Sequence, residues 1–237
     1  MRMRPLWPSA NPAAFSDWQV LADDLEQFLD QQRLDQVIGI GHSMGATTTL
    51  RLALRQPQRF RSLVLIDPVI FPPAMSIAWD LVFRLGLAYR LHPLVKGALR
   101  RRTCFENQSA MFANYRKKQV FRRMDDKSLL AYVNALACPD QAGQIQLCYP
   151  ADWEARIYVT GIRADRELWR QLPGLVPPVL FLRGSETDTF LANTARMVQK
   201  RLKTARIAAI PDSTHLVALE KPDQVYKETI QFLSEGF

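Results

Sequence analysis

The sequence contains little cysteine and little histidine, with three of each among 237 residues. Cys104, Cys138 and Cys148 are widely spaced and odd in number, so they indicate neither a metal site nor a disulfide framework. This cysteine usage favours a reducing compartment, and we predict a cytoplasmic protein. No group of His, Cys and Asp residues has the spacing of metal ligands, and no Gly-rich phosphate loop is present. We therefore predict no metal and no cofactor.

Long hydrophobic runs are also absent. The most apolar stretch, residues 77–89, is interrupted by Asp80 and Arg84 and is too polar to cross a bilayer. The first eight residues are basic but lack the apolar centre of a signal peptide. With 48% hydrophobic and 23% charged residues, the composition is that of an ordinary globular protein. The length allows one domain with a sizeable core and an insertion.

The strongest motif of the sequence is Gly41-His42-Ser43-Met44-Gly45. An apolar run at 37–40 precedes it and a helical pattern at 46–55 follows, which predicts a strand, a sharp turn and a helix with the serine at the apex. The glycines flank Ser43 at two residues' distance on either side. We expect that only very small residues fit there, because the strained turn presses its neighbours against the strand and the helix. This arrangement is typical of a nucleophilic serine.

Apolar strands alternate with helices on both sides of a long middle segment. Strand, helix and strand at this spacing predict an α/β fold with a mostly parallel, doubly wound sheet. The expected strands are 37–40, 62–67, 179–183 and 205–210, and the expected helices are 17–32, 43–56, 193–203 and one that opens at Pro222. The middle segment has several helical patterns punctuated by prolines. We predict a core of residues 1–69 and 153–237 and a helical cap of residues 70–152.

A serine hydroxyl needs a base within hydrogen-bond reach, so the three histidines are the candidates. His215 lies in a loop after the last predicted strand, at the sheet edge where α/β proteins present catalytic groups, and is the predicted base. His42, adjacent to Ser43, is expected to be structural. His92, in the cap, is expected to be a surface or packing residue.

The base in turn needs a carboxylate that holds it. Asp188 follows the predicted strand 179–183 within a strand-end loop and is the predicted acid. Glu186, two residues earlier, is one alternative. Asp67, which ends the strand after the serine helix, is another, although a turn residue before Pro68 is the reading we favour for it. The resulting chain order is serine, aspartate and histidine.

In type and order, these motifs resemble those of an α/β-hydrolase-fold protein with a helical cap. The resemblance covers roughly residues 17–70 and 175–235, and the cap is outside it. It implies that Ser43 forms an acyl-enzyme, that His215 moves the proton and that Asp188 holds the imidazole. It also implies that the backbone N–H of Met44 donates to the oxyanion. A serine at the apex argues against the related dehalogenases and epoxide hydrolases, which place an aspartate there.

The sequence departs from the family's pattern before the serine motif. Only about 36 residues precede the strand 37–40, and they contain no His-Gly loop that would supply a second oxyanion donor. The chain is therefore expected to begin partway through the fold, as an internal start of a longer protein or as a weakened relative. Loss of one donor costs about 10²–10³ in turnover. We also expect strand 37–40 to lie at an exposed sheet edge, which favours aggregation.

The positive charge is concentrated in the predicted cap. Residues 84–127 contain twelve Lys and Arg and three acidic residues, a balance of +9 against +8 for the whole chain. Apolar side chains between 79 and 91 are interleaved with these charges. A solvated outer face is the interpretation we favour, and an anionic membrane surface, a lipid or an anionic acyl substrate are the alternatives. We predict no nucleic-acid partner, because no recognition module accompanies the charge.

The predicted function is a serine hydrolase that cleaves a carboxylic ester or related acyl bond of a small molecule. The predicted site consists of Ser43, Asp188 and His215, with Met44 at the oxyanion. A thioesterase, a lactonase, an acyltransferase or a carbon–carbon bond hydrolase of the same fold remain alternatives. The alternative from another class is a non-catalytic relative that keeps the pocket for an acyl or lipid ligand.

Overall fold

A four-stranded parallel sheet forms the centre of the protein. The computed structural model describes residues 1–139, 143–163 and 165–235. The strand order of the central sheet is β1-β2-β6-β7, with β1 Val37–His42, β2 Phe60–Ile66, β6 Val179–Gly184 and β7 Arg206–Ile210. All pairings are parallel, and Ile40, Val64 and Leu180 lie in register across three strands. The four predicted strands are thus confirmed within one or two residues.

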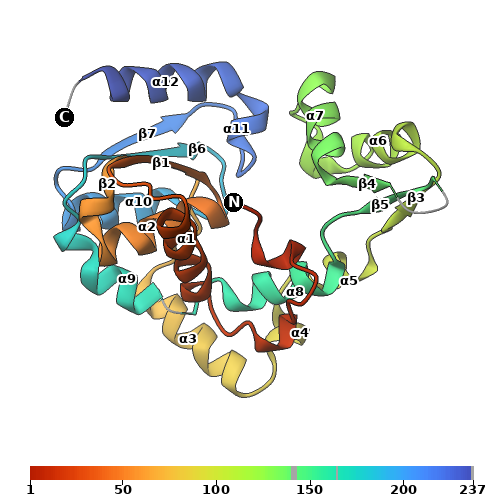
Figure 1. The fold of residues 1–237 in the computed structure, drawn as a ribbon, viewed down its shortest axis with the longest axis horizontal. Coiled ribbons are helices and arrows are strands. Elements are labelled where there is room, and N and C mark those ends of the chain that lie inside the picture. Colours follow the sequence, from red (N-terminus) through yellow and green to blue (C-terminus); the bar gives the residue numbers. More distant parts are fainter. Residues whose placement is uncertain (140–142, 164, 236–237) are drawn as a thin grey trace.

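Helices cover both faces of this sheet (Figure 1). One face packs against α1 Gln19–Gln31, α2 Met44–Arg55, α9 Asp165–Gln171 and α10 Ala192–Arg201. The other face packs against α11 Val217–Glu220 and α12 Pro222–Ser234. Side chains of β2 and β6 alternate between the two clusters, so Leu65 and Phe181 face α2 while Val64 and Leu182 face α12. This arrangement confirms the predicted α/β fold class.

The segment between β2 and β6 contains most of the remaining elements. It begins with α3 Pro73–Arg84, α4 Ala88–Leu91 and α5 Val95–Arg100, and continues with β3 Cys104–Phe105, α6 Gln108–Arg116, α7 Asp126–Leu136, β4 Ala137–Pro139, β5 Ile145–Leu147 and α8 Ala151–Thr160. The short strands form an antiparallel sheet in the order β3-β5-β4. The expectation of a purely helical cap is therefore incomplete. The domain boundaries at 69 and 153 stay a prediction.

Short 3-10 turns connect the larger elements, and two of them shape the N-terminal segment. The turns are Arg4–Leu6, Pro12–Ala14, Pro57–Arg59, Gln119–Phe121 and Leu172–Gly174. Arg4 binds the buried carboxylate of Asp24 on α1, with 2.8 Å between Nε and Oδ2. Met3 packs against an apolar cluster that includes Trp18, directly before α1, and Trp153 of α8. These contacts fix the N-terminal segment between the core and the α8 region.

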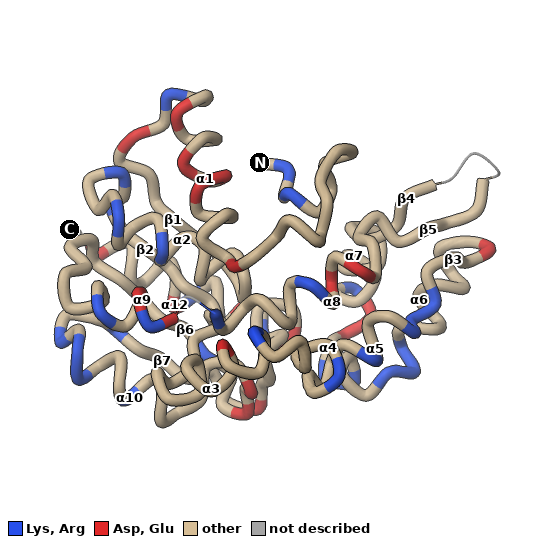
Figure 2. The backbone as a smooth tube through the Cα atoms, turned by 90° about the horizontal axis from the view of Figure 1, so that it is seen from below, with Lys and Arg blue, Asp and Glu red and all other residues tan. Residues whose placement is uncertain are grey.

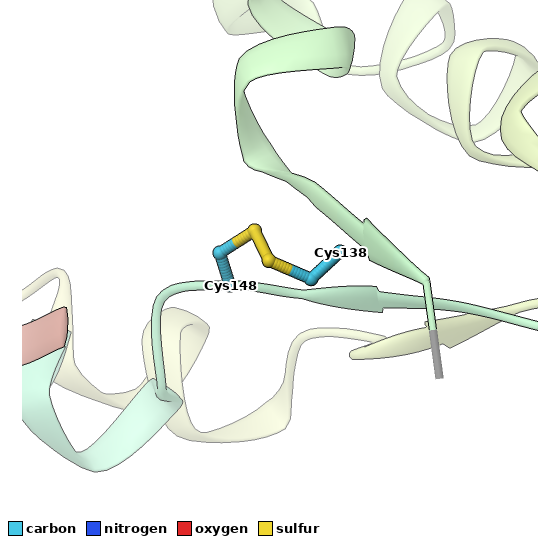
Figure 3. The surroundings of a disulfide bond; sticks show 2 residues. All are labelled: Cys138 and Cys148. Atoms are coloured by element: carbon cyan, nitrogen blue, oxygen red, sulfur yellow. A yellow bond between two sulfur atoms is a disulfide. The ribbon is translucent and has the colours of Figure 1, made fainter. Parts of the chain in front are cut away.

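Cys138 and Cys148 form a disulfide at the end of the β4–β5 pair (Figure 3). Their Cα atoms are 5.2 Å apart because β4 and β5 pair antiparallel, with Ala137 opposite Leu147. The expectation that the cysteines form no disulfide is corrected on this point, and Cys104 remains an exposed free thiol. The ten-residue spacing of these cysteines does not by itself predict that they pair. Only the antiparallel pairing of β4 and β5 brings the two thiols together.

In the described part of the chain, no helix is long and apolar enough to cross a membrane.

Strand β1 lies at one edge of the central sheet in the described residues. The side chains of Ile38 and Ile40 on this strand are 45% and 54% exposed. They lie on the sheet face that α12 covers at β2 and β6. On the opposite face, a Cβ at Gly39 would lie 2.7 Å from the Thr49 side chain and 3.0 Å from those of Leu63 and Phe60, so this face is closely packed. The expected exposed edge is therefore observed, with two isoleucines at the position where an internal strand would be covered.

Candidate active site

Ser43 occupies the sharp turn between β1 and α2. Its φ of 55° and ψ of −122° lie outside the regions that ordinary residues prefer, so the turn stores backbone strain. The backbone N–H of Ser43 donates to Ile66 O at 2.9 Å, which ties the turn to the end of β2. The predicted strand, turn and helix are thus present, and the serine stands at the apex.

The two glycines of the motif have different surroundings. A Cβ at Gly41 would lie 2.6 Å from the backbone N of Ala46, so only glycine fits there. A Cβ at Gly45 would meet nothing within 4 Å. The expectation that both positions require a very small residue is right for Gly41 and wrong for Gly45, whose Cβ position faces open space.

This difference gives a matched pair of substitutions. Gly41→Ala is expected to lower the free energy of unfolding by about 1–3 kcal/mol, because the added carbon overlaps backbone that cannot move without shifting the serine turn. Gly45→Ala is expected to be neutral or slightly stabilising, since alanine favours helix over glycine. Thermal denaturation of both variants checks this, and equal losses in the two would contradict it.

His215 lies beside Ser43 although 172 residues separate them. Its Nε2 is 2.7 Å from Ser43 Oγ. The loop that carries it follows β7 and is held by the buried Glu220, which accepts hydrogen bonds from the backbone N–H of Thr214 at 2.6 Å and from its hydroxyl at 2.8 Å. Glycine is required at Gly184, because a Cβ there would lie 2.2 Å from Thr214 O. The structure thus brings two of the predicted site residues together.

The carboxylate beside His215 belongs to Asp67 and not to Asp188. Asp67 is fully buried, and its Oδ1 is 3.1 Å from His215 Nδ1. Asp188 is exposed on the loop after β6, and Glu186, the other alternative, pairs with Arg123 of the cap at 2.6 Å. The predicted position of Asp188 is therefore corrected. The reason is the strand order of the sheet. Asp67 directly follows β2, the immediate neighbour of the serine strand, whereas Asp188 lies four residues beyond the end of β6.

Two threonines of the loop after β6 complete the surroundings of Asp67. Its Oδ1 accepts hydrogen bonds from the hydroxyls of Thr187 at 2.5 Å and Thr189 at 2.7 Å, and its Oδ2 accepts from the N–H of Gly184 at 2.7 Å. These donors offset the cost of burying a carboxylate. Thr189 Oγ1 also lies 2.8 Å from His215 Nδ1. Because the Thr189 hydroxyl donates to Asp67, it accepts from Nδ1–H, which leaves Nε2 free to accept the proton of Ser43.

The comparison with known proteins identifies the family. A model of the alpha/beta hydrolase family matches residues 4–228. The chain belongs to this family. It is 22% identical to the esterase YbfF of Escherichia coli (strain K12) over 219 residues, which cover 92% of this chain and 76% of that protein. It is 25% identical to ethanol acetyltransferase 1 of Hanseniaspora uvarum over 232 residues, 88% of this chain and 62% of that protein.

The solved structures agree on the fold. E-2-(acetamidomethylene)succinate hydrolase matches with a TM-score of 0.72 and 19% sequence identity, over 92% of this chain and 74% of that chain. The predicted family, the predicted fold class and the prediction of a hydrolase enzyme are confirmed. The roles of individual side chains in this α/β hydrolase rest on the geometry alone.

Sequence reasoning did not find Thr187 and Thr189. The only signal is the alternation in Thr187-Asp188-Thr189, which places both hydroxyls on one side of the loop and the aspartate on the other.

Thr189→Val is expected to lower the turnover of the hydrolase by about 10-fold, because valine keeps the shape of the side chain but removes the hydroxyl shared by Asp67 and His215. Thr187→Ser keeps its hydroxyl and is expected to keep the turnover. Steady-state kinetics on an activated ester measure this. An unchanged kcat in Thr189→Val would contradict a positioning role.

The other two histidines have structural contacts. His92 stacks on Tyr158, with ring centroids 5.7 Å apart, and contacts Trp79 edge-on at 5.3 Å. His42 Nε2 lies 2.8 Å from the backbone O of His215, so the ring donates to the loop that carries His215. Burial, and next the neighbouring His215, lower the pKa of His42 below its ordinary 6.5. A neutral His42 with the proton on Nε2 fits this environment.

The lowered pKa of His42 gives a pH dependence of stability. In the pH range below about 6.5, unfolded chains take up a proton at this site more readily than folded ones. The contribution of His42 to stability is thus present above pH 6.5 and is lost as the pH falls through the lower folded pKa. We expect His42→Gln, whose amide still donates to His215 O, to weaken this acid dependence. Urea unfolding at pH 5 and pH 7.5 measures it; an identical pH dependence in wild type and variant would argue against the assignment.

The cap contacts the loops that carry the site. Leu216 and Leu219, which follow His215, pack against the cap cluster around Phe105 and Leu129. The Arg123–Glu186 pair joins the cap to the loop after β6. Residues of the predicted cap thus contact both the loop that carries His215 and the loop that carries Thr187 and Thr189.

One cavity lies between the N-terminal segment and the β4–β5 end of the cap. Its volume is about 560 Å³. Trp153, which lines it, belongs to the same cluster as the side chain of Met44, directly after the serine. Ser43, Met44 and His215 are not among the residues that line the cavity, so its connection to the serine turn is only through this shared cluster. Its walls include Leu6, Trp7, Pro12, Ala135, Cys138 and Cys148.

Proposed function

We propose that this α/β hydrolase cleaves a carboxylic ester, or a related acyl bond, through an acyl-enzyme on Ser43. The observation that carries the proposal is the chain of contacts from Ser43 Oγ to His215 Nε2 at 2.7 Å and from His215 Nδ1 to Asp67 Oδ1 at 3.1 Å. A nucleophile, a base and a buried carboxylate in this order are the requirements of nucleophilic acyl transfer. The proposal assigns the acid role to Asp67.

The proposed steps use the contacts among Ser43, His215 and Asp67. His215 Nε2 takes the proton of Ser43 as Oγ attacks the acyl carbon, and the backbone N–H of Met44, at the start of α2, donates to the oxyanion. The imidazolium then protonates the leaving alcohol, and an ester remains on Ser43. Water attacks this ester with His215 again as the base, which releases the acid and restores Oγ–H. Asp67 and Thr189 hold the Nδ1 side throughout and stabilise the imidazolium.

The surroundings of the serine support an apolar acyl or alcohol group on the substrate. Met44, which follows the serine, belongs to one apolar cluster with Val69 and Trp153, and the cavity that Trp153 lines also has leucine and proline walls. The relative in Escherichia coli is named an esterase. We therefore propose a small ester with an aliphatic or aromatic group as the substrate class.

Hydrolysis of p-nitrophenyl esters of two, four and eight acyl carbons tests the proposal. We expect slow turnover that depends on Ser43 and His215 and is absent in Ser43→Ala and His215→Ala. We expect the longer acyl chains to give the higher kcat/KM, because they bury more apolar surface. Turnover that persists in Ser43→Ala would overturn the proposal. Tight ester binding by the folded wild type without any turnover would favour a binding protein.

An acyltransferase is the second candidate, favoured by the similarity to ethanol acetyltransferase 1. The acyl-enzyme on Ser43 would then pass its acyl group to an alcohol and not to water. Adding an alcohol acceptor to the ester assay distinguishes the two outcomes. A new ester product together with faster p-nitrophenol release identifies transfer, and free acid as the only product identifies hydrolysis.

A further inference from the structure

The outer face of α3, α4 and α5 is apolar and exposed. We call it the α3–α5 surface, and its members are large apolar side chains that are each at least 39% exposed. They are Ile77, Leu81, Leu85, Leu87, Tyr89, Leu91, Leu94 and Leu99. Five of them, between Leu81 and Leu99, are 51–62% exposed. Such a concentration of large apolar side chains is unusual for a free surface and marks a contact with a partner.

These helices have two distinct apolar faces. Their inner residues, among them Phe83, Ala88, Val95 and Ala98, pack against Ala155 and Val159 of α8. Trp79 is fixed as well, since its Nε1–H donates to Val159 O at 2.9 Å. The exposed residues Ile77 and Leu81 of α3 and Leu85, directly after it, recur every four positions, which is one side of a helix. Because α8 is already covered by the inner face, the outer face is left for another contact.

The charges around the α3–α5 surface are almost all positive. Arg90, Lys96 and Arg100 are exposed between its leucines and have no ion-pair partner in the described residues. The one acidic side chain between 73 and 102 is Asp80, which binds Arg84 and Arg163 at 2.7 Å and 3.1 Å. Figure 2 shows Lys and Arg gathered along α5 and α6 on this side of the molecule. Any partner of this surface must therefore bury apolar side chains and also bind positively charged ones.

We propose that the α3–α5 surface binds the surface of an anionic lipid bilayer, with the three helices lying in the plane of the interface. Leucines that enter the acyl region and basic side chains that meet the headgroups are the pattern of interfacial helices. A second copy of this chain is a poorer occupant, because a twofold contact would bring the same unpaired basic residues together. The inference is independent of the proposed ester hydrolysis, and its test needs no substrate.

Sedimentation with vesicles tests the proposal on the full chain. We expect binding to vesicles of phosphatidylcholine with 30% phosphatidylglycerol and much weaker binding to phosphatidylcholine alone. Each basic residue near an anionic surface strengthens binding about fivefold, so Arg90→Gln, Lys96→Gln and Arg100→Gln together are expected to weaken it by about 100-fold. The matched control is Lys200→Gln, Lys203→Gln and Lys227→Gln, which removes the same charge elsewhere and is expected to keep binding within about threefold.

The apolar contact is tested separately. Leu85→Glu with Leu91→Glu is expected to lower binding at least tenfold. Val176→Glu with Ile230→Glu changes two apolar sites of the core that are also exposed, at 76% and 46%, and is expected to change binding much less. Circular dichroism confirms that each variant is folded. A fluorescent probe on Leu85→Cys, with Cys104→Ser removing the free thiol, is expected to shift to the blue with anionic vesicles, and the same probe on Val176→Cys is not.

Three outcomes would overturn the proposal. The first is wild-type binding no greater to anionic than to neutral vesicles. The second is an equal loss of binding in the α3–α5 and control variants. The third is a dimer of the wild type, seen by sedimentation velocity, that Leu85→Glu with Leu91→Glu converts to a monomer without any effect on vesicles.

Discussion

Asp67→Asn is expected to lower the rate of ester hydrolysis by about 10⁴, close to the level of Ser43→Ala. The asparagine amide donates where the carboxylate accepts, so it favours the His215 tautomer with the proton on Nε2, which faces Ser43 and cannot then accept its proton. The loss is large because the buried carboxylate also stabilises the imidazolium during the reaction. Pre-steady-state release of p-nitrophenol from an activated ester measures the acylation step directly.

The matched control for this substitution is Asp188→Asn. Asp188 is exposed on the loop after β6, so its replacement is expected to change acylation by less than about twofold. The acylation rates of the two variants therefore distinguish the roles of Asp67 and Asp188 in one assay. A large loss in Asp188→Asn with near-normal rates in Asp67→Asn would show that the loop rearranges in solution and would contradict the assignment of the acid.

Arg51→Leu is expected to be the most destabilising single substitution outside the site. Arg51 of α2 and Asp165 at the start of α9 are both buried, with Arg51 Nη2 and Asp165 Oδ1 2.8 Å apart. Burial raises the pKa of Asp165 to about 7 even with the guanidinium beside it. Removing one partner of such a pair leaves an uncompensated buried group and costs about 3–5 kcal/mol. For a chain of this size we expect the Tm to fall by about 10 °C.

The control lies one helical turn further along α2. Arg55 forms ion pairs with Asp23 and Glu26 at the surface, where its side chain is 30% exposed. Arg55→Leu is expected to cost less than about 1 kcal/mol, because exposed pairs are well solvated in either state. Differential scanning fluorimetry of the two variants is sufficient. Similar Tm values for Arg51→Leu and Arg55→Leu would mean that the buried pair contributes little.

The sequence predicted the core fold well because its signals there are local. The apolar runs of β1, β2, β6 and β7 are bounded by glycine, proline or charged residues, so their limits were found within one or two residues. The serine turn was equally clear, since its glycines and its strand–helix context occur within ten residues. His215, which the structure places beside Ser43, could be selected from the sequence because only three histidines are candidates.

The parts that were missed depend on contacts between distant residues. Asp67 and Asp188 both follow buried strands, and only the pairing of β2 with β1 shows which carboxylate reaches His215. The threonines that hold Asp67 carry no motif. The Cys138–Cys148 disulfide depends on the β4–β5 pairing, and strands of two or three residues leave almost no periodic pattern. Side-chain size alone predicted a tight fit at Gly45, where the structure has open space.

The central claim is that Ser43 is an activated nucleophile, and labelling with a fluorophosphonate tests it most directly. The reagent forms a covalent phosphonyl ester with an activated serine and releases fluoride, so intact mass and peptide mapping show which residue reacted. We expect one adduct per folded chain, on Ser43, and none in Ser43→Ala. We also expect labelling to be strongly slowed in His215→Ala and Asp67→Asn but unchanged in Asp188→Asn. A folded wild-type chain that remains unlabelled, or an adduct on another serine, would contradict the account.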